Sequence, residues 1–369
     1  MSEKDINSIR NDFNKSDDML KKKVSALIEE RKTAGLEGLV GGLEAIIINV
    51  EEFNHESAVQ DLLNTTGYDV AEYFANSELK TSVLTLENSA DILVSNRKDE
   101  ENPFRKYNIA PKTDELPNTR LETFVFHTDD IKRYVDIQKE RGIKFLSDEV
   151  IDKDNYLFIQ TTPSKYTGIS VGLIQWKGKS RTYHSGEDQE LKVSVEKPDW
   201  AYLKNIKYLD HTATRVRALE RDDAILEFMS LTNYNFEFAI YVKSFNSITN
   251  VARLSAKDFA MVFTSGISPY KSEEESGPTE KFIHNYNTRT HHMAFHTENI
   301  DRVFSSLKKD GMEFLVELVG SPEEGLKQTF TESSPNTFLV NEYIHRFGDF
   351  DGFFTKNNVT LLTESTEKQ

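Results

Sequence analysis

The sequence contains no cysteine. This absence excludes disulfide-stapled scaffolds, thiolate zinc sites, iron–sulfur clusters and cysteine nucleophiles together. A metal site in this chain would therefore have to be built from histidine and carboxylate ligands, and the chain has 9 histidines and 61 acidic residues.

Positive charge and long apolar runs are also scarce. The 45 Lys and Arg residues are outnumbered by 61 Asp and Glu residues, which gives a formal net charge of -16. Binding to a phosphate backbone depends on clustered basic residues, so we expect no nucleic-acid partner. No stretch approaches the roughly 18 apolar residues of a membrane span, and the opening residues are too polar for a secretory signal. We therefore expect a cytoplasmic protein with no membrane segment.

The chain is long enough for more than one hydrophobic core. It has 369 residues, 37% of them hydrophobic and 11% aromatic, and single cores stop growing at about 250–300 residues. The first forty residues are rich in helix formers but have only a weak apolar rhythm. Residues 1–40 are therefore predicted to form a solvated, polar helical extension. The remainder predicts two domains, residues 41–200 and residues 201–369.

Comparison of the sequence with itself indicates an internal duplication. A shift of 166 residues superposes segment 43–68 on 209–234, and a shift of 169 residues superposes 126–146 on 295–315. Matched positions include Leu43 with Leu209, Tyr68 with Tyr234, Phe126 with Phe295 and Gly142 with Gly311. Each copy begins with an apolar strand and an amphipathic helix, followed by further strand-like runs. The sequence therefore predicts an α+β fold of four βαβββ modules, which start near residues 43, 121, 207 and 290 and pair into two pseudo-symmetric halves.

A site confined to one half should produce a chemical mismatch between the copies. The mismatched pairs are His211 with Ala45, His292 with Thr123 and Glu342 with Leu173. Two imidazoles and one carboxylate from three strands form a facial triad, which leaves three coordination positions open and suits Fe(II). We therefore predict a metal site of His211, His292 and Glu342. The neighbouring His291 is an alternative to His292, because successive strand side chains point to opposite faces and only one of the two can point into a site.

Five motifs in the C-terminal half resemble those of a known family. They are Asp210-His211, His292-Met293-Ala294-Phe295-His296-Thr297, Gln328-Thr329-Phe330-Thr331, Glu342-Tyr343-Ile344-His345-Arg346 and Gly352-Phe353-Phe354-Thr355-Lys356-Asn357-Asn358. Together with the four-module plan, these motifs are similar to those of the vicinal oxygen chelate superfamily, and within it to 4-hydroxyphenylpyruvate dioxygenase and its relatives. The order of the motifs in that family favours His292 over His291 as the ligand.

The resemblance implies a glyoxalase-like arrangement in which each half is an open barrel and the C-terminal half alone binds metal. It also implies an Fe(II)-dependent dioxygenase that oxidatively decarboxylates an aromatic 2-oxo acid with dioxygen and couples this step to a hydroxylation. The partners would be a small-molecule 2-oxo acid and dioxygen, and we expect a homo-oligomer. The residues assigned to catalysis are Gln328, Phe330, Phe353 and Asn357. Residues 352–362 are expected to form a lid helix that excludes water from the site.

The substrate-binding segments depart from the family pattern. The positions that the family uses for substrate are occupied here by Asn250, Ser265, Gln328, Phe330, Val340 and Phe353. A glutamine-containing segment expected before His292 falls near residues 277–280, which contain no glutamine. The identity of the substrate is therefore left open. Two other functions also stay open: an extradiol ring-cleavage dioxygenase with the same triad, and a catalytically silent binding protein of the same fold.

Overall fold

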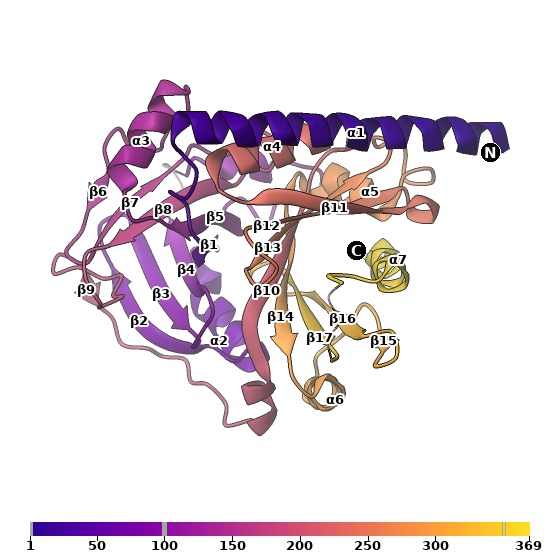
Figure 1. Ribbon diagram of the computed structural model, residues 1–369. Helices are drawn as coiled ribbons and strands as arrows, with labels where there is room; N and C mark the ends of the chain where they lie inside the picture. The colour runs from indigo at the N-terminus through magenta and orange to yellow at the C-terminus, as the bar shows by residue number, and fades with distance from the viewer. Residues whose placement is uncertain (1–2, 98–101, 349, 351) are drawn as a thin grey trace.

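The computed structural model describes residues 3–97, 102–348, 350 and 352–369, with the backbone alone for residues 3–16. The described strands form two curved sheets, and each sheet is built from one half of the chain (Figure 1). The predicted α+β fold of four βαβββ modules in two pseudo-symmetric halves is confirmed. None of the helices in the described residues combines the length and the apolar character that crossing a membrane requires.

The N-terminal sheet contains two modules. The first comprises β1 (Leu43–Asn49), α2 (His55–Thr65), β2 (Asp69–Ala75), β3 (Leu79–Thr85) and β4 (Asp91–Arg97). The second comprises β5 (Arg120–His127), α3 (Ile131–Glu140), β6 (Ile151–Asp152), β7 (Tyr156–Gln160) and β8 (Ser170–Trp176). A short strand, β9 (Gln189–Glu190), pairs with β2, so the strand order is β6-β7-β8-β5-β1-β4-β3-β2-β9.

The C-terminal sheet repeats this plan. Its first module comprises β10 (Ile206–Arg215), α4 (Arg221–Leu231), β11 (Asn235–Val242), β12 (Ser247–Arg253) and β13 (Ala260–Gly266). Its second comprises β14 (Arg289–Thr297), α6 (Ile300–Lys309), β15 (Val319–Ser321), β16 (Leu326–Ser333) and β17 (Val340–Arg346). The strand order is β11-β12-β13-β10-β14-β17-β16-β15, and the additional helices are α5 (Pro278–Tyr286) and α7 (Lys356–Ser365).

One large hydrophobic core joins the two halves. It contains residues of both sheets and of the helices packed on them, and aromatic rings meet across the boundary between the halves. The ring of Phe126 on β5, for example, lies 5.9 Å from that of Phe228 on α4 and 5.2 Å from that of Tyr234. The opposite face of each sheet has its own smaller clusters and its own cavity. Each half therefore has a cavity of its own on the face that points away from the shared core.

Helix α1 (Glu3–Ala34) confirms the predicted helix, but residues 17–34 pack one face on the protein and so are not a fully solvated extension. It lies along α4 (Figure 1) and buries the side chains of Leu20, Val24 and Arg31. The guanidinium of Arg31 donates hydrogen bonds to the main-chain carbonyls of residues 229, 232 and 234. The packing was not predicted because the apolar rhythm is weak and a buried arginine looks like a surface charge in the sequence.

Helix α7 also differs from its prediction. It starts at Lys356 rather than at residue 352, because the Thr355 side chain caps it by accepting a hydrogen bond from the Asn358 N–H. It contacts β11 at one edge of the second sheet and β15 and β16 at the other, so it covers that face of the sheet (Figure 1). Residues 352–355 form an irregular segment that leads to the helix.

Candidate metal centre

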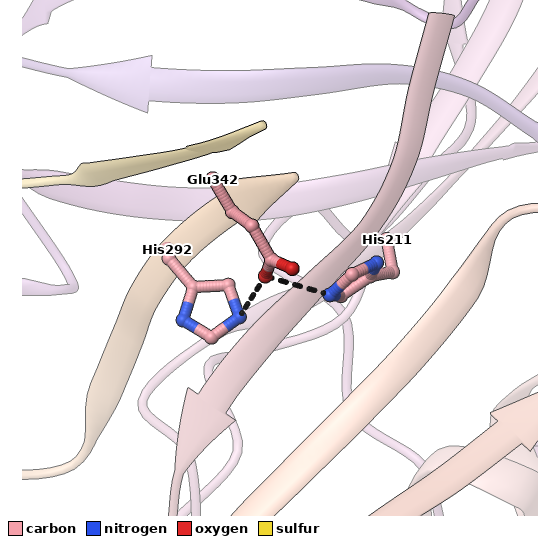
Figure 2. A group of neighbouring side chains, drawn as sticks. All are labelled: His211, His292 and Glu342. Atoms are coloured by element: carbon pink, nitrogen blue, oxygen red, sulfur yellow. Dashed lines mark ion pairs between the residues drawn. The ribbon is translucent and has the colours of Figure 1, made fainter. Parts of the chain in front are cut away.

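Three residues from neighbouring strands meet on the face of the second sheet that α7 covers. His211 lies on β10, His292 on β14 and Glu342 on β17, and β14 is paired with both other strands. The Glu342 carboxylate points between the two imidazoles (Figure 2). Nε2 of His211 lies 3.2 Å and Nε2 of His292 lies 3.3 Å from the same oxygen, Oε2 of Glu342. The exposed fractions of His211, His292 and Glu342 are 0%, 8% and 1%.

This arrangement fits the ligands of one metal ion. Two ligand atoms about 2.1 Å from an ion and at right angles to each other are about 3 Å apart, which agrees with both contacts. His211 Nε2 is buried and makes no hydrogen bond, since its approach to Glu342 lacks hydrogen-bond geometry. Within the residues that the structure describes, no other group of His, Asp and Glu side chains converges in this way. The donor set suits Fe(II) among other divalent ions.

Asp210 orients the first histidine. Its Oδ1 lies 2.8 Å from Nδ1 of His211, and its carboxylate also pairs with both terminal nitrogens of Arg346 at 2.6 and 3.0 Å. Neighbours on a flat strand point to opposite faces, but the pairing of β10 with β14 skips Asp210 between Leu209 and His211. This β-bulge brings Asp210 to its neighbour. In the sequence comparison Asp210 matches Glu44 of the N-terminal half, and this match indicates a structural acid that both halves share.

His291 supports the second histidine in the same way. Its Nδ1 lies 2.9 Å from Nδ1 of His292, and its Nε2 lies 2.7 Å from Oε1 of Gln369. Pairing between β10 and β14 skips His291, so a second β-bulge lets both histidines reach the cavity. The prediction that only one of them could do so is wrong for this reason. If Nε2 of His292 binds a metal ion, its Nδ1 carries the proton and donates it to His291.

Gln328 and Asn358 orient the carboxylate ligand. Gln328 Nε2 donates to Oε1 of Glu342 at 2.5 Å, and Asn358 Nδ2 donates to Oε1 of Gln328 at 3.1 Å. Gln328 is fully buried behind Glu342 and does not line the cavity, so the prediction that it contacts substrate is corrected. Asn357 was predicted for the site, but it is exposed and donates to Glu324 instead. The helical turn of α7 places the next residue, Asn358, inward.

A small cavity adjoins the three residues. It has a volume of about 50 Å³ and is lined on one side by α7, and a single water occupies about 10–15 Å³ on this measure. Phe330 lies beside His292, with ring centroids 4.7 Å apart, and lines the cavity. Much of the remaining wall consists of hydroxyl side chains, namely Ser247, Thr249, Thr264, Thr279, Thr363 and Thr366. At this volume the cavity has room for only a few water molecules.

Besides Gln328 and Phe353, three predicted substrate positions do not line this cavity, namely Asn250, Ser265 and Val340. Asn250 and Ser265 are buried on the other face of β12 and β13, where the amide of Asn250 donates to the Phe263 carbonyl. Strand side chains alternate, so an assignment that is wrong by one residue selects the wrong face, and Thr249 and Thr264 take these places. Val340 shares a face with Glu342 but is packed beneath Phe330 and α7.

Two phenylalanines cover the first histidine. The ring centroids of Phe353 and Phe354 lie 5.3 and 5.2 Å from that of His211. The Phe353 ring is flanked by the guanidiniums of Arg253 at 5.1 Å and Arg346 at 4.8 Å. Phe353 also lines an open cleft of about 1030 Å³ between the two halves. Its ring therefore separates this cleft from the candidate metal centre.

The surroundings shift the pKa values of the two histidines in opposite directions. Burial opposes protonation of His211, but the Glu342 carboxylate and the Asp210 hydrogen bond outweigh it and raise the pKa of His211. Burial lowers the pKa of His292 well below its usual value, and the nearby His291, His211 and Arg215 add to this effect. His292 is therefore neutral, which is the form that binds a metal ion.

Comparison with known proteins identifies the architecture. No protein-family model and no curated protein sequence matches this chain. A mutant of 4-hydroxymandelate synthase from Streptomyces coelicolor superposes with a TM-score of 0.64 at 15% identity, over 89% of this chain and 98% of its own. A xylose isomerase-like TIM barrel/4-hydroxyphenylpyruvate dioxygenase fusion protein superposes with a TM-score of 0.61 at 13% identity, over 89% of this chain and 52% of its own. This chain has the vicinal oxygen chelate fold.

In this vicinal oxygen chelate fold the N-terminal half keeps both bulges but not the ligands. Strand pairing places Ala45 and Thr123 at the positions of His211 and His292, as predicted. The counterpart of Glu342 is Gly172 rather than the predicted Leu173, because Gly172 pairs with β5 as Glu342 pairs with β14. The shift between copies grows from 169 to 170 residues before β7, and a comparison without gaps misses that change. None of the three N-terminal side chains offers an imidazole or carboxylate.

Proposed function

We propose that this chain is an Fe(II)-dependent dioxygenase that oxidatively decarboxylates a 2-oxo acid and couples this reaction to a hydroxylation. One observation carries the proposal: the buried group in which Nε2 of His211 and Nε2 of His292 lie 3.2 and 3.3 Å from one oxygen of Glu342. Three protein ligands on one side leave the opposite side of an ion open. The likeness to a dioxygenase fusion protein and to 4-hydroxymandelate synthase supports this interpretation.

His211, His292 and Glu342 would hold the ion. When bound, Fe(II) would supply coordination positions for the two oxygens of a 2-oxo acid and the redox chemistry that activates dioxygen. Asp210 and His291 fix the imidazoles so that both Nε2 atoms point into the site, and Gln328 turns one carboxylate oxygen toward them. These residues hold the ligand geometry before substrate arrives.

The segment that precedes α7, together with α7 itself, excludes water. Phe353 and Phe354 cover His211, and Val359 and Leu362 of α7 line the cavity. A dry site protects a reactive oxidant from reaction with solvent. The hydrogen bonds from Asn358 to Gln328 and from Gln328 to Glu342 connect this cover directly to a ligand, so closure and ligand geometry are coupled.

The test is anaerobic loading with Fe(II) followed by addition of 2-oxo acids. We expect a visible charge-transfer band with a 2-oxo acid, because the band requires bidentate chelation of the iron, and carbon dioxide release when oxygen is admitted. The Glu342→Ala variant should show neither, whereas Thr123→Ala, at the N-terminal counterpart of His292, should behave as wild type. Ring cleavage of a catechol without a 2-oxo acid would support the extradiol alternative. Iron binding without turnover of either substrate would identify a binding protein.

A further inference from the structure

One buried arginine close to the candidate metal centre has no hydrogen-bond or ion-pair partner. Arg215 lies at the end of β10 and is 3% exposed. Its guanidinium makes no hydrogen bond or ion pair to any residue that the structure describes, and Nη1 is fully buried. The centroid of the Phe282 ring lies 4.2 Å from the guanidinium carbon. Arg215 does not itself line the cavity beside the candidate metal centre, so a ligand reaches it only past the side chains that do.

Other buried arginines of the chain make at least one hydrogen bond through the guanidinium, although Nε of Arg31, Nε of Arg120 and Nη1 of Arg289 have no partner. Arg31 donates to three main-chain carbonyls, Arg120 to Asn108 and to two carbonyls, and Arg221 to Asp17, Asp222 and Tyr241. Burial of a cation without an opposite charge is strongly unfavourable, and the ring of Phe282 offsets this only in part. The buried charge of Arg215 is therefore unfavourable for the stability of the folded protein.

A second unsatisfied group lies next to Arg215. Thr264 on β13 is its direct partner in the sheet, and the Thr264 hydroxyl lines the cavity without a hydrogen-bond partner. The Phe282 ring that contacts Arg215 also lies 5.4 Å from the ring of His291, so Arg215 is close to the histidine pair. A guanidinium and a hydroxyl side by side supply several donors and one positive charge, which is the complement of a carboxylate.

The position of Arg215 relative to the ligands suggests how an anion would lie. His211, Ala213 and Arg215 are on one face of β10, and Ala213 pairs with His292. Arg215 is thus two residues, or about 7 Å, farther along the strand than the level of His292. A chain of five or six carbon atoms spans this distance when one end is chelated at the metal.

We propose that Arg215 and Thr264 bind a carboxylate at the far end of the substrate, so that the substrate is a dianionic 2-oxo acid. The inference rests on the proposed function for the chelated end of the substrate. It differs from the aromatic 2-oxo acid implied by the sequence resemblance. A substrate carboxylate would also supply the opposite charge that the Arg215 guanidinium lacks in the folded protein.

The test compares three six-carbon probes by calorimetry on the full chain loaded anaerobically with Fe(II). The probes are 2-oxoadipate, 2-oxohexanoate, which lacks the second carboxylate, and adipate, which lacks the oxo group. We expect 2-oxoadipate to bind at least about tenfold more tightly than 2-oxohexanoate, as a charge-assisted hydrogen bond provides. Arg215→Gln should remove that difference, Arg215→Lys should keep part of it, and Thr264→Val should weaken 2-oxoadipate alone. Ser265→Ala, which removes a hydroxyl from the opposite face, should change nothing.

Thermal unfolding provides a second measurement. Arg215→Gln should melt at a higher temperature than wild type, because it removes an unpaired buried charge. Equal affinity for 2-oxoadipate and 2-oxohexanoate, or a preference that survives Arg215→Gln, would overturn the proposal. A lower melting temperature with unchanged binding would show a structural arginine and would overturn it too. Binding of adipate that depends on Arg215, without any gain from the oxo group, would support the anion site while contradicting the proposed 2-oxo acid chemistry.

Discussion

The Asp210 carboxylate both orients His211 and pairs with Arg346. Replacement of Asp210 by Asn should separate its effect on metal binding from its effect on stability. The side chain is nearly isosteric and its amide oxygen can still accept a hydrogen bond from Nδ1 of His211, so the change removes chiefly the negative charge. Asp210 pairs with Arg346 through contacts of 2.6 and 3.0 Å, and the side chains are 8% and 18% exposed. Breaking such a pair leaves a buried charge and destabilises by about 3–5 kcal/mol. Because Arg346 is partly exposed, we expect a loss of about 3 kcal/mol in the free energy of unfolding.

The same variant should weaken metal binding by about 10- to 100-fold, since carboxylates that orient a ligand histidine raise its basicity. Chemical denaturation and titration with Fe(II) under anaerobic conditions measure the two effects. The double variant Asp210→Asn with Arg346→Met should regain stability but not metal affinity. Glu44→Gln, at the matching position of β1, provides the control. The reasoning would be refuted if metal affinity followed stability in the double variant, or if Glu44→Gln weakened metal binding equally.

Three further predictions follow from other contacts. Asn358→Ala should lower metal affinity several-fold because Gln328 loses its partner, whereas Asn357→Ala should leave metal affinity unchanged in the same titration. Phe353→Ala should retain iron but consume more moles of oxygen than it forms of product, because it exposes His211 to the cleft. An oxygen electrode combined with product quantification measures this ratio. Asp91→Asn should stabilise the protein by up to about 3 kcal/mol at pH 7 and not at all near pH 4, measured by denaturation at both pH values.

The pH dependence at Asp91 has a definite sign. Burial raises the pKa of Asp91 to about 6, so the folded carboxyl group holds its proton more tightly than the unfolded one. Stability therefore falls as the pH rises from about 4 to about 6 and stays low above that range. The asparagine side chain of the Asp91→Asn variant is neutral throughout and can still accept the hydrogen bond from Tyr183. A stability difference that does not change between pH 4 and pH 7 would contradict this explanation.

The fold and the three central residues could be predicted because duplication provides an internal comparison. Strand and helix periodicity places the four modules, and a ligand set present in one half stands out against Ala45 and Thr123. Thr123 was matched correctly because the copies stay in register as far as β5, whereas Gly172 was missed because the register changes by one residue before β7. A one-residue change is invisible in an ungapped comparison but moves a side chain to the other face of a strand.

The residues that orient the ligands could not be predicted from alternation alone. Asp210 and His291 both occupy β-bulges, which bring neighbouring side chains together where a regular strand would separate them. Alternation also predicted that only one of His291 and His292 could reach the cavity. Asn250 and Ser265 were assigned from the family resemblance, where an error of one residue selects the wrong face of the strand. Arg31 and Arg215 show a related difficulty, since a sequence does not distinguish a buried arginine from an exposed one.

The metal content of the purified chain tests the central claim most directly. Anaerobic reconstitution with Fe(II), removal of loosely bound metal and elemental analysis should give one iron per chain for the wild type. His211→Ala, His292→Ala and Glu342→Ala should each give close to none while circular dichroism shows a folded protein, because two remaining ligands cannot fix the ion. Thr123→Ala should keep the full complement. Stoichiometric iron in His292→Ala, or loss of iron in Thr123→Ala, would contradict the assignment of the metal centre to His211, His292 and Glu342.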